Sequence, residues 1–465
     1  MNWPTISMTT EPEGIHSMSD TERDDKMILG ALISPTSSHI AGWRHEGALT
    51  NVDATFPELV KVVKSAERAM LDFIFIADEL SMPAGEDEML SRDPLVYRFE
   101  PLTLIAALAV ASKDIGLVVT QSTTYNEPYH VARKLASIDQ LSGGRLGWNL
   151  VTSYVPEEAR NFSRSEHLAN VDRYERAEEF LQVAQGLWES WDDDAFDGDR
   201  ETGRYFDPRK MHRLNHEGKH FSVRGPLNVR RPVQGAPVQV QAGSSEAGRE
   251  LAAKYAEVTF TAQNSLDAAL AFTNDIKMRA AKYGRSASSV RVIAGVQPII
   301  GATMEEAHAK YKEMQSLIHP EVGLTRLSQL LDYDVTNLPL DSPLPEDLPE
   351  TENYKSRREL IIETGRRENL TLRELYQKVV SAYGHRVVIG TPQSVADELA
   401  DWFTAGAVDG YIISPTYLPD GLDVFNQTVV PELRARGLLR EGYEGKTFRE
   451  NLGLERPERG SSATS

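Results

Sequence analysis

A short turn near the middle of the chain has the residue types that bind phosphate. Gly243, Ser244 and Ser245 stand between a short apolar run and a helical pattern that begins near Glu246. The first N–H groups of a helix have no partner inside the helix, so together with two hydroxyls they favour an anion. Gly243 allows a ligand to approach the backbone closely. The turn predicts a phosphate site, and an ordinary serine N-cap is the alternative interpretation.

Motifs for other common sites do not stand out. The sequence contains no G-x-G-x-x-G and no G-x-x-x-x-G-K-[ST], so neither a Rossmann dinucleotide site nor a P-loop is indicated. The chain has no cysteine, which excludes disulfides and a thiolate nucleophile, and its 11 histidines are scattered. We therefore expect no bound metal.

The elements that would position the turn are short apolar runs alternating with helical patterns. Continuous apolar strands are typical of a parallel sheet that is buried on both faces. Eight strand–helix units favour an α/β fold of the (β/α)8 TIM-barrel type over an open sheet. The predicted strands are residues 27–34, 72–78, 115–120, 145–151, 238–242, 258–261, 290–296 and 409–414.

Two long insertions interrupt this alternation. Residues 152–236 follow the fourth predicted strand and residues 302–385 follow the seventh, so both leave the carboxyl-terminal face of the barrel, where barrel enzymes build their active sites. Long excursions there are typical of lids and substrate walls, and subunit contacts are the alternative. The Pro-rich, acidic stretch 332–354 has little apolar material to hold it in a core, which predicts a mobile lid. We expect one domain over 26–455, with disordered ends at 1–25 and 456–465.

Charge and hydropathy limit the partners of the chain. Its 69 acidic and 50 basic residues give a formal net charge of −19, which repels nucleic acid and anionic membrane surfaces. No run approaches 18 apolar residues, and the first 25 residues lack the apolar region of a signal peptide. These features predict a soluble, cytoplasmic enzyme.

A series of longer stretches, spread over about residues 27–440, resembles one family. They are SHIAGWR (38–44), AERAMLDFIFIAD (66–78), EPL (100–102), QSTTYNEPYHVAR (121–133), SIDQLSGGR (137–145), GWNLVTS (147–153), DRYERAEEF (172–180), QAGSS (241–245), GTP (390–392) and GAVDG (406–410). In this order they resemble the bacterial-luciferase-like flavin monooxygenases. The similarity is to the branch that holds nitrilotriacetate, EDTA, dibenzothiophene-sulfone and long-chain alkane monooxygenases.

The resemblance implies a two-component monooxygenase. It implies a TIM barrel that forms a homodimer or homotetramer and binds FMN at the carboxyl-terminal face. A separate NAD(P)H-dependent flavin reductase would supply FMNH2, and O2 would then oxygenate a small organic substrate. The lack of a dinucleotide-binding motif in this chain agrees with that division of labour.

The resemblance also assigns the FMN ligands. Asp78, Thr124 and Asn149 would lie beside the isoalloxazine ring, whose edge carries donors and acceptors that need polar partners. Tyr174 would reach the phosphate together with Ser244 and Ser245. Alternative roles are a helix N-cap for Asp78, a turn for Thr124, a polar strand end for Asn149 and the core for Tyr174. The chain departs from the family at Asn170, where a histidine often stands four residues before that tyrosine.

Two histidines are the candidates for proton transfer during oxygenation. His39 follows the first predicted strand and His385 precedes the GTP stretch, and an unperturbed imidazole titrates near neutrality. A surface or structural role is the alternative for each. Trp43 is a candidate apolar wall, and Tyr125 is the next candidate for proton transfer.

Other functions remain open at this point. An oxidoreductase of the same superfamily that uses the deazaflavin F420 shares the barrel, and a non-catalytic flavin-binding protein is a further alternative. The bond cleaved is expected to be C–S, C–N or C–halogen. Stretch 36–45 carries only one arginine to pair a carboxylate, which favours neutral or aromatic substrates.

Overall fold

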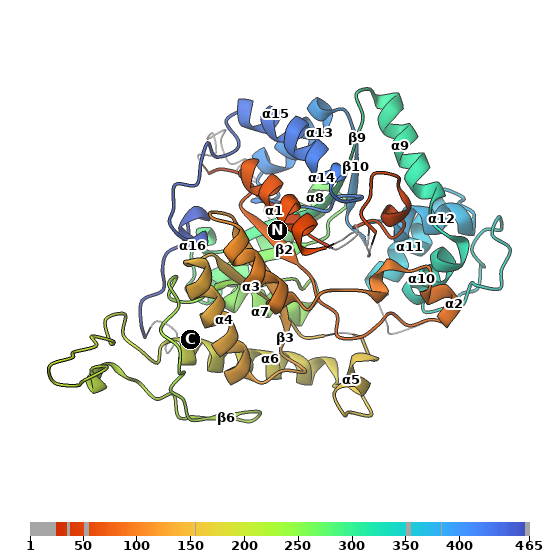
Figure 1. Ribbon diagram of the computed structural model, residues 1–465. Coiled ribbons are helices and arrows are strands. Elements are labelled where there is room, and N and C mark those ends of the chain that lie inside the picture. The colour runs from red at the N-terminus through yellow and green to blue at the C-terminus, as the bar shows by residue number, and fades with distance from the viewer. Residues whose placement is uncertain are drawn as a thin grey trace, which may run out of the picture.

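Eight parallel strands close into a barrel in the computed structural model, which describes residues 25–34, 38–50, 55–153, 155–349, 355–382 and 384–460 (Figure 1). Neighbouring strands pair in parallel around the ring, and pairing of the sixth with the seventh closes it. The predicted α/β barrel is therefore confirmed. In chain order the strands are β1 (Ile28–Leu32), β2 (Phe73–Ile76), β3 (Gly116–Ser122), β4 (Leu146–Val151), β7 (Val238–Gln241), β8 (Val258–Thr261), β9 (Arg291–Ile300) and β11 (Gly410–Ile413).

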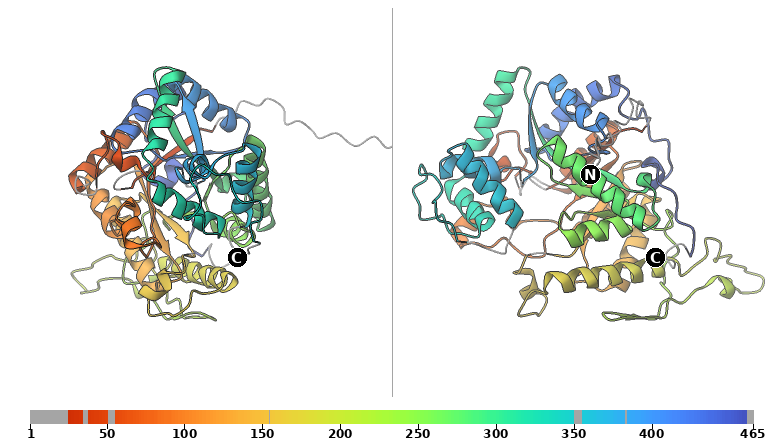
Figure 2. Two further views of the ribbon diagram at one scale, coloured as in Figure 1. Left: turned by 90° about the vertical axis from the view of Figure 1, so that its right-hand side faces the viewer. Right: turned by 180° about the vertical axis from the view of Figure 1, so that it is seen from behind.

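The strands are largely buried on both faces, as in a barrel covered by helices. One set of side chains packs inside the barrel and the alternate set packs against the surrounding helices. Figure 2 shows the helices around the strands from two further sides. These helices include α1 (Phe56–Arg68), α3 (Pro101–Ala111), α4 (Pro128–Ser142), α6 (Asn170–Trp188), α7 (Glu246–Tyr255), α8 (Leu266–Lys282), α13 (Pro392–Thr404) and α15 (Val430–Ala435).

A short carboxyl-terminal helix fills the amino-terminal end of the barrel. Phe448 begins α16 (Phe448–Asn451), is 1% exposed and packs with the interior residues, its ring 5.7 Å from that of Phe73. A Cβ atom at Gly116 would lie 2.4 Å from the Phe448 ring, and one at Gly147 would lie 3.1 Å from it. The two glycines thus make room for the aromatic ring.

One strand outside the barrel was not predicted. Strand β10 (Arg386–Gly390) runs parallel to the second half of β9, with Arg386 opposite Val296 and Gly390 opposite Ile300. This pairing extends β9 to ten residues, four beyond its predicted end at 296.

The second insertion folds into a helical unit with a core of its own. Its helices are α9 (Met304–Ser316), α10 (Pro320–Leu331), α11 (Lys355–Arg367) and α12 (Leu372–Val380). Buried side chains of α10, α11 and α12 pack with Ile40 and Ala41 from the loop after β1 and with Met89 from the short helix α2 (Asp87–Leu90). Figure 1 shows these three helices grouped beside α2, while α9 lies along β9 and β10. The insertion therefore contacts the loops at the carboxyl-terminal face.

The expected lack of apolar anchors in stretch 332–354 was wrong. Val335 is fully buried and Leu344 is 7% exposed, both in the core of the insertion. The backbone is also held, because Leu372 N–H donates to the Ser342 carbonyl at 2.8 Å and Arg373 N–H donates to that of Leu340 at 2.9 Å. Residues 350–354 lie outside the described part of the chain.

The first insertion divides into a barrel helix and an extended segment. It includes α5 (Glu158–Asn161) and α6, and α6 packs against α4 like the other barrel helices. The remainder holds the hairpin of β5 (His216–Glu217) and β6 (Ser222–Val223), and Figure 1 shows these yellow-green loops reaching away from the barrel. Residues 1–24 and 461–465, most of the two ends expected to be disordered, lie outside the described residues. Within the described residues, no helix is long and apolar enough to cross a membrane.

Candidate functional site

The predicted phosphate turn lies at the carboxyl-terminal end of β7, directly before α7. Ser245 caps the helix, because its hydroxyl accepts from the Gly248 N–H at 3.1 Å. Ser244 and Ser245 are both exposed. Tyr174 reaches the same point from α6, with its hydroxyl 3.3 Å from Ser245 Oγ. The structure therefore confirms the N-cap interpretation of Ser245 and also brings the three predicted hydroxyls together.

Gly243 is required at this turn by close packing. A Cβ atom there would lie 2.4 Å from Gln241 Nε2 and 3.0 Å from the Cα atom of Gly248. The backbone of the turn can therefore pass close to the start of α7 only without a side chain. The free N–H groups of a ten-residue helix and two exposed hydroxyls face solvent here, which is an arrangement suited to a phosphate group.

Asn149 presents a buried polar atom at the same end of the barrel. It lies on β4 opposite Thr120 of β3, and its Nδ2 donates to Thr120 Oγ1 at 2.9 Å. Its side chain is 3% exposed, and Oδ1 has no hydrogen-bond partner among the described atoms. A buried acceptor left without a donor costs about 1–3 kcal/mol. This atom fits a ligand that offers an N–H group, as the edge of a flavin ring does.

Thr124 lies two residues beyond the end of β3 and is held by the backbone. Its hydroxyl donates to the Thr152 carbonyl at 2.6 Å, and its N–H donates to Ser122 Oγ at 3.1 Å. The side chain is 1% exposed. The turn interpretation therefore describes its present contacts, and the hydroxyl oxygen keeps lone pairs that can accept from a ligand.

Asp78 lies two residues beyond the end of β2. Its Oδ1 accepts from the Glu79 N–H at 3.0 Å, and no described helix begins between Asp78 and α2, so it does not cap a helix. Burial raises the pKa of this carboxyl to about 6, with the nearby Glu100 and Glu158 acting in the same direction and the Glu79 N–H opposing them. Asp78 is thus a carboxyl that can hold a proton near neutral pH.

His39 differs from the expectation that it titrates near neutrality. Its side chain is 1% exposed, and burial lowers its pKa to about 4, while a hydrogen bond with Gln315 of α9 opposes that shift. Nδ1 accepts from the Ala41 N–H at 3.1 Å, which places the proton of the neutral ring on Nε2. His39 is therefore neutral at physiological pH and can donate a hydrogen bond, but it does not exchange a proton there.

His385 lies over the open end of the barrel, directly before β10. A Cβ atom at Gly295 of β9 would lie 2.4 Å from Nδ1 of His385. The imidazole therefore occupies space that is open because residue 295 has no side chain. The ring also lies 5.1 Å from that of Phe260 on β8, which in turn lies 6.0 Å from that of Phe75 on β2. The imidazole is half-buried above an aromatic floor.

Sequence reasoning missed Gln297 and the contact of Tyr125 with His167 at this end of the barrel. Gln297 of β9 is fully buried and donates through Nε2 to the Ser38 carbonyl at 3.4 Å, and its Oε1 lacks a partner among the described atoms. The Tyr125 hydroxyl forms a hydrogen bond of 2.5 Å with Nδ1 of His167. The Tyr125 ring also stacks on the Phe162 ring, with the ring centres 4.8 Å apart. The partners come from distant segments, so no local pattern in the sequence indicates either contact.

A histidine pattern that the sequence analysis did not single out lies in the first insertion. His216, Glu217, Gly218, Lys219 and His220 match H-E-x-x-H, a zinc motif only when it lies on a helix. Here the first two residues form strand β5 of a hairpin. No three His, Cys, Asp or Glu side chains among the described residues are grouped so that they could hold a metal ion. The side chain of Asn170, the departure from the family pattern, lies outside the described part.

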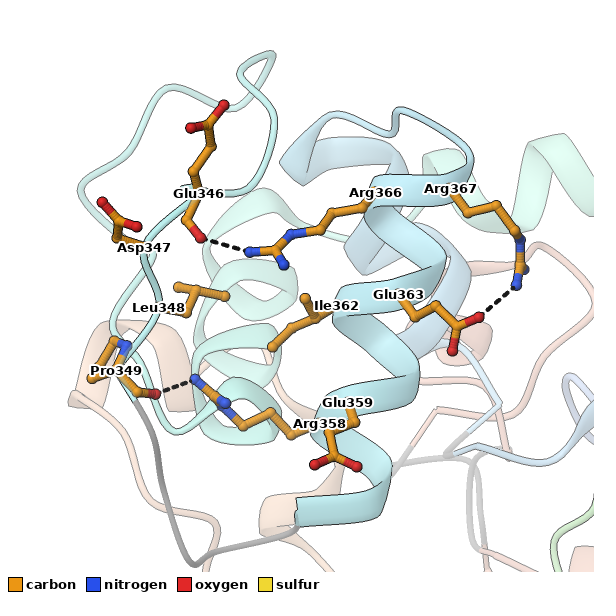
Figure 3. A pocket seen from close by; sticks show the side chains of 10 residues that line it. All are labelled: Glu346, Asp347, Leu348, Pro349, Arg358, Glu359, Ile362, Glu363, Arg366 and Arg367. Carbon is orange, nitrogen blue, oxygen red and sulfur yellow. Dashed lines mark hydrogen bonds and ion pairs between the residues drawn. The ribbon is translucent and has the colours of Figure 1, made fainter.

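Two cavities adjoin the second insertion. The larger, of about 970 Å³, lies between residues 346–349 and α11, away from the barrel strands (Figure 3). Its Arg366 and Arg358 already donate to the carbonyls of Glu346 and Pro349, at 2.6 and 2.5 Å. The smaller, of about 180 Å³, is lined by the residues that directly follow His39 and by the link between α9 and α10. Only the smaller cavity adjoins the candidate site.

Comparison with known proteins assigns the family. Residues 33–409 match the family described as luciferase-like monooxygenase. The chain is 48% identical over 439 residues to N-acetyl-S-(2-succino)cysteine monooxygenase of Bacillus subtilis (strain 168), covering 94% of this chain and 98% of that protein. It is also 48% identical over 440 residues to nitrilotriacetate monooxygenase component A of Aminobacter aminovorans, covering 93% and 97%. The crystal structure of riboflavin lyase with modified FMN and riboflavin has a TM-score of 0.81 at 31% identity, covering 94% and 99%. The chain therefore belongs to the luciferase-like monooxygenase family and is an enzyme of the monooxygenase class.

Proposed function

We propose that the chain is the oxygenase component of a two-component monooxygenase that uses FMNH2 and O2. The observation that carries this proposal is the convergence of a phosphate-binding turn and a buried, unpartnered acceptor at one end of the barrel. Tyr174, Ser244 and Ser245 provide the phosphate end, and Asn149 provides the acceptor. The modified FMN in a solved relative that is 31% identical supports an FMN cofactor here.

The described residues fit FMN in a consistent orientation. Tyr174, Ser244 and Ser245 would hold the phosphate at the start of α7, and Asn149, Thr124 and Asp78 would provide polar partners for the ring. Bound as FMNH2, the cofactor supplies two electrons, and O2 provides one oxygen atom for the substrate and one for water. The residues of the chain bind and orient the ring, and the helical insertion over the loops after β1 and β2 excludes water.

His385 is the residue that we assign to proton transfer beside the ring. It is half-buried above the aromatic floor, whereas His39 is buried and neutral. A positioned acid–base group contributes about 10²–10⁴-fold. His385→Gln should lower product formation and raise H2O2 release while FMN affinity stays near that of the wild type. Full coupling in this variant would move the assignment to Tyr125.

A separate flavin reductase is the proposed partner. A relative that is 48% identical is named component A, which implies at least one further component in that system. This chain also lacks the G-x-G-x-x-G motif of a Rossmann dinucleotide site. The substrate is proposed to be a small organic compound that is cleaved at a C–S, C–N or C–halogen bond.

Reconstitution with and without a reductase tests the proposal. The purified chain with FMN and NADH should not consume O2 above the background, because it has no nicotinamide site. Addition of any competent flavin reductase should start O2 consumption, with nitrilotriacetate and N-acetyl-S-(2-succino)cysteine as first substrates to assay for an oxygenated product. NADH-dependent turnover without reductase would contradict the two-component assignment. Failure of the chain to bind FMN in either redox state would contradict the cofactor.

A further inference from the structure

We propose that the smaller cavity beside His39 is a subsite for a carboxylate group of the substrate, an inference that rests on the proposed function. The cavity has about 180 Å³ and is formed by three separate segments of the chain. Ligand sites for whole organic molecules usually measure about 300–1,000 Å³. This volume therefore suits one end of a substrate whose reacting part lies at the barrel mouth.

The charges that line the cavity are opposite to the charge of the molecule. The whole chain carries a formal net charge of −19, whereas the described lining residues include Arg44 and Arg92 and no acid. Arg92 pairs with Glu88 and, at 3.4 Å, with Glu321, so these two acids just outside the lining offset it. Arg44 is exposed and donates one N–H to the Leu317 carbonyl, and no ion pair with a described acid engages it. Its guanidinium keeps N–H groups for an anion.

Two ring nitrogen atoms at the cavity also lack hydrogen-bond partners. Trp43 Nε1 is buried and has no acceptor among the described atoms. His319 Nδ1 is buried without a hydrogen bond, and the nearest carboxylate oxygen, from Glu321, is 4.0 Å away. An indole nitrogen can only donate, so it requires an acceptor. A carboxylate oxygen satisfies both this donor and the free N–H groups of Arg44.

The remaining walls are apolar and suit a short hydrocarbon segment. Ile40, Ala41, Ile318 and Val322 are buried and contribute to the core of the insertion. The cavity adjoins the barrel mouth, because Ile40 follows His39 directly and Gln315, which hydrogen-bonds with His39, precedes the α9–α10 link. A substrate with a carboxylate at the end of a short hydrocarbon segment can therefore anchor here and extend toward the barrel mouth.

This inference reverses the expectation of a neutral or aromatic substrate. That expectation counted a single arginine in residues 36–45. The fold adds His319 from a segment that lies about 275 residues further along the chain, whereas Glu88 and Glu321 offset the charge of Arg92. The larger cavity near α11 is a weaker candidate, because Glu346, Asp347, Glu359 and Glu363 line it together with its arginines.

Binding of small acids to the FMN-free and the FMN-loaded protein tests the subsite. The probes are succinate and nitrilotriacetate, with succinamide as the uncharged counterpart of succinate, and calorimetry gives the affinity. Both acids should bind saturably, and succinamide at least tenfold more weakly. Arg44→Gln should weaken succinate about tenfold or more and leave succinamide unchanged, because it removes a charge-assisted hydrogen bond. Trp43→Phe, which keeps an aromatic wall but removes the donor, should weaken succinate roughly fivefold.

Arg68→Gln is the matched control, since Arg68 is exposed at the end of α1 and outside the cavity. Thermal unfolding shows whether each variant is folded. Equal losses for Arg44→Gln and Arg68→Gln, equal affinity for succinate and succinamide, or no saturable binding of either acid would each overturn the subsite. These outcomes are separate from those for the proposed function. Failure to bind FMN would contradict the function while Arg44-dependent succinate binding still stood.

Discussion

The hydroxyls of the proposed phosphate site come from two distant parts of the chain. Ser244 and Ser245 precede α7, and Tyr174 reaches them from α6. Hydrogen bonds to a charged group contribute about 1.5–3 kcal/mol each. Ser244→Ala combined with Ser245→Ala should therefore weaken FMN about tenfold or more in a fluorescence titration. The exposed pair Ser286 and Ser288, when changed to alanine, is the control and should leave the affinity unchanged. Equal affinity in both double variants would remove the phosphate assignment.

His39 should make stability depend on pH. Its pKa is lowered from 6.5 to about 4 by burial, so between these values the unfolded chain binds a proton that the folded chain does not. Its contribution is therefore fully present above about pH 6.5 and is lost as the pH falls toward 4, by up to roughly 3 kcal/mol. Urea unfolding of the wild type and of His39→Gln between pH 7.5 and 4.5 checks this. The variant should lose less stability over that range, and parallel curves would contradict the burial argument.

The candidate site could be predicted only as far as its residues follow local patterns or family stretches. The turn at Ser244 and Ser245 is local, because a strand end, a glycine and a helix start are adjacent in the sequence. The pKa of His39 could not be predicted, because it results from burial by an insertion that begins more than 260 residues later. Gln297 and His167 were missed for the same reason, since their partners adjoin them only after the barrel closes.

At the scale of elements, the strands were easier to predict than their lengths. Most of the eight barrel strands appear as short apolar runs, whereas β7 (VQVQ) and β8 (VTFT) alternate apolar and polar residues. Strand β10 is also short, but it precedes a helix cap at Thr391 and follows a charged insertion, so the run was assigned to no strand. Strand β10 also needs β9 as a pairing partner beyond the end of the barrel. Neither segment shows this pairing in its own sequence.

The helix α16 should be a major source of barrel stability although it has only four residues. Phe448 fills the space above Gly116 and Gly147 inside the barrel. Removal of a buried phenylalanine side chain costs about 3–5 kcal/mol. Phe448→Ala should lower the free energy of unfolding by that amount in urea titrations. Phe56→Ala, at a position that is 39% exposed, is the control and should cost much less. Similar losses for the two variants would show that the ring does not support the barrel.

The whole molecule contains two large cores with different roles. One surrounds the barrel strands, and the other belongs to the helical insertion and includes side chains from the loops after β1 and β2. Val335 and Leu344 anchor the described part of the Pro-rich stretch, residues 332–349, in the second core. Movement of the insertion would then involve its helices together.

Separate cores predict separate responses to core mutations. Leu375 of α12 is fully buried in the insertion core, and Leu399 of α13 is fully buried in the barrel core. Replacement of a buried leucine by alanine costs about 2–5 kcal/mol. Leu375→Ala should increase amide hydrogen exchange in α10 and α12 while the barrel strands keep the protection of the wild type. Leu399→Ala should instead increase exchange in α13 and the adjoining strands.

The functional consequence of a loosened insertion follows from its position over the barrel mouth. In the proposed reaction, water that reached the bound flavin would divert oxygen into H2O2 instead of product. Leu375→Ala should therefore raise the H2O2 released per FMNH2 oxidised, whereas Leu399→Ala should lower stability without changing that ratio when both are assayed below their unfolding temperatures. Equal exchange in both regions for both variants would show one cooperative unit. Unchanged H2O2 release in Leu375→Ala would show that water exclusion depends on the barrel loops and not on the insertion.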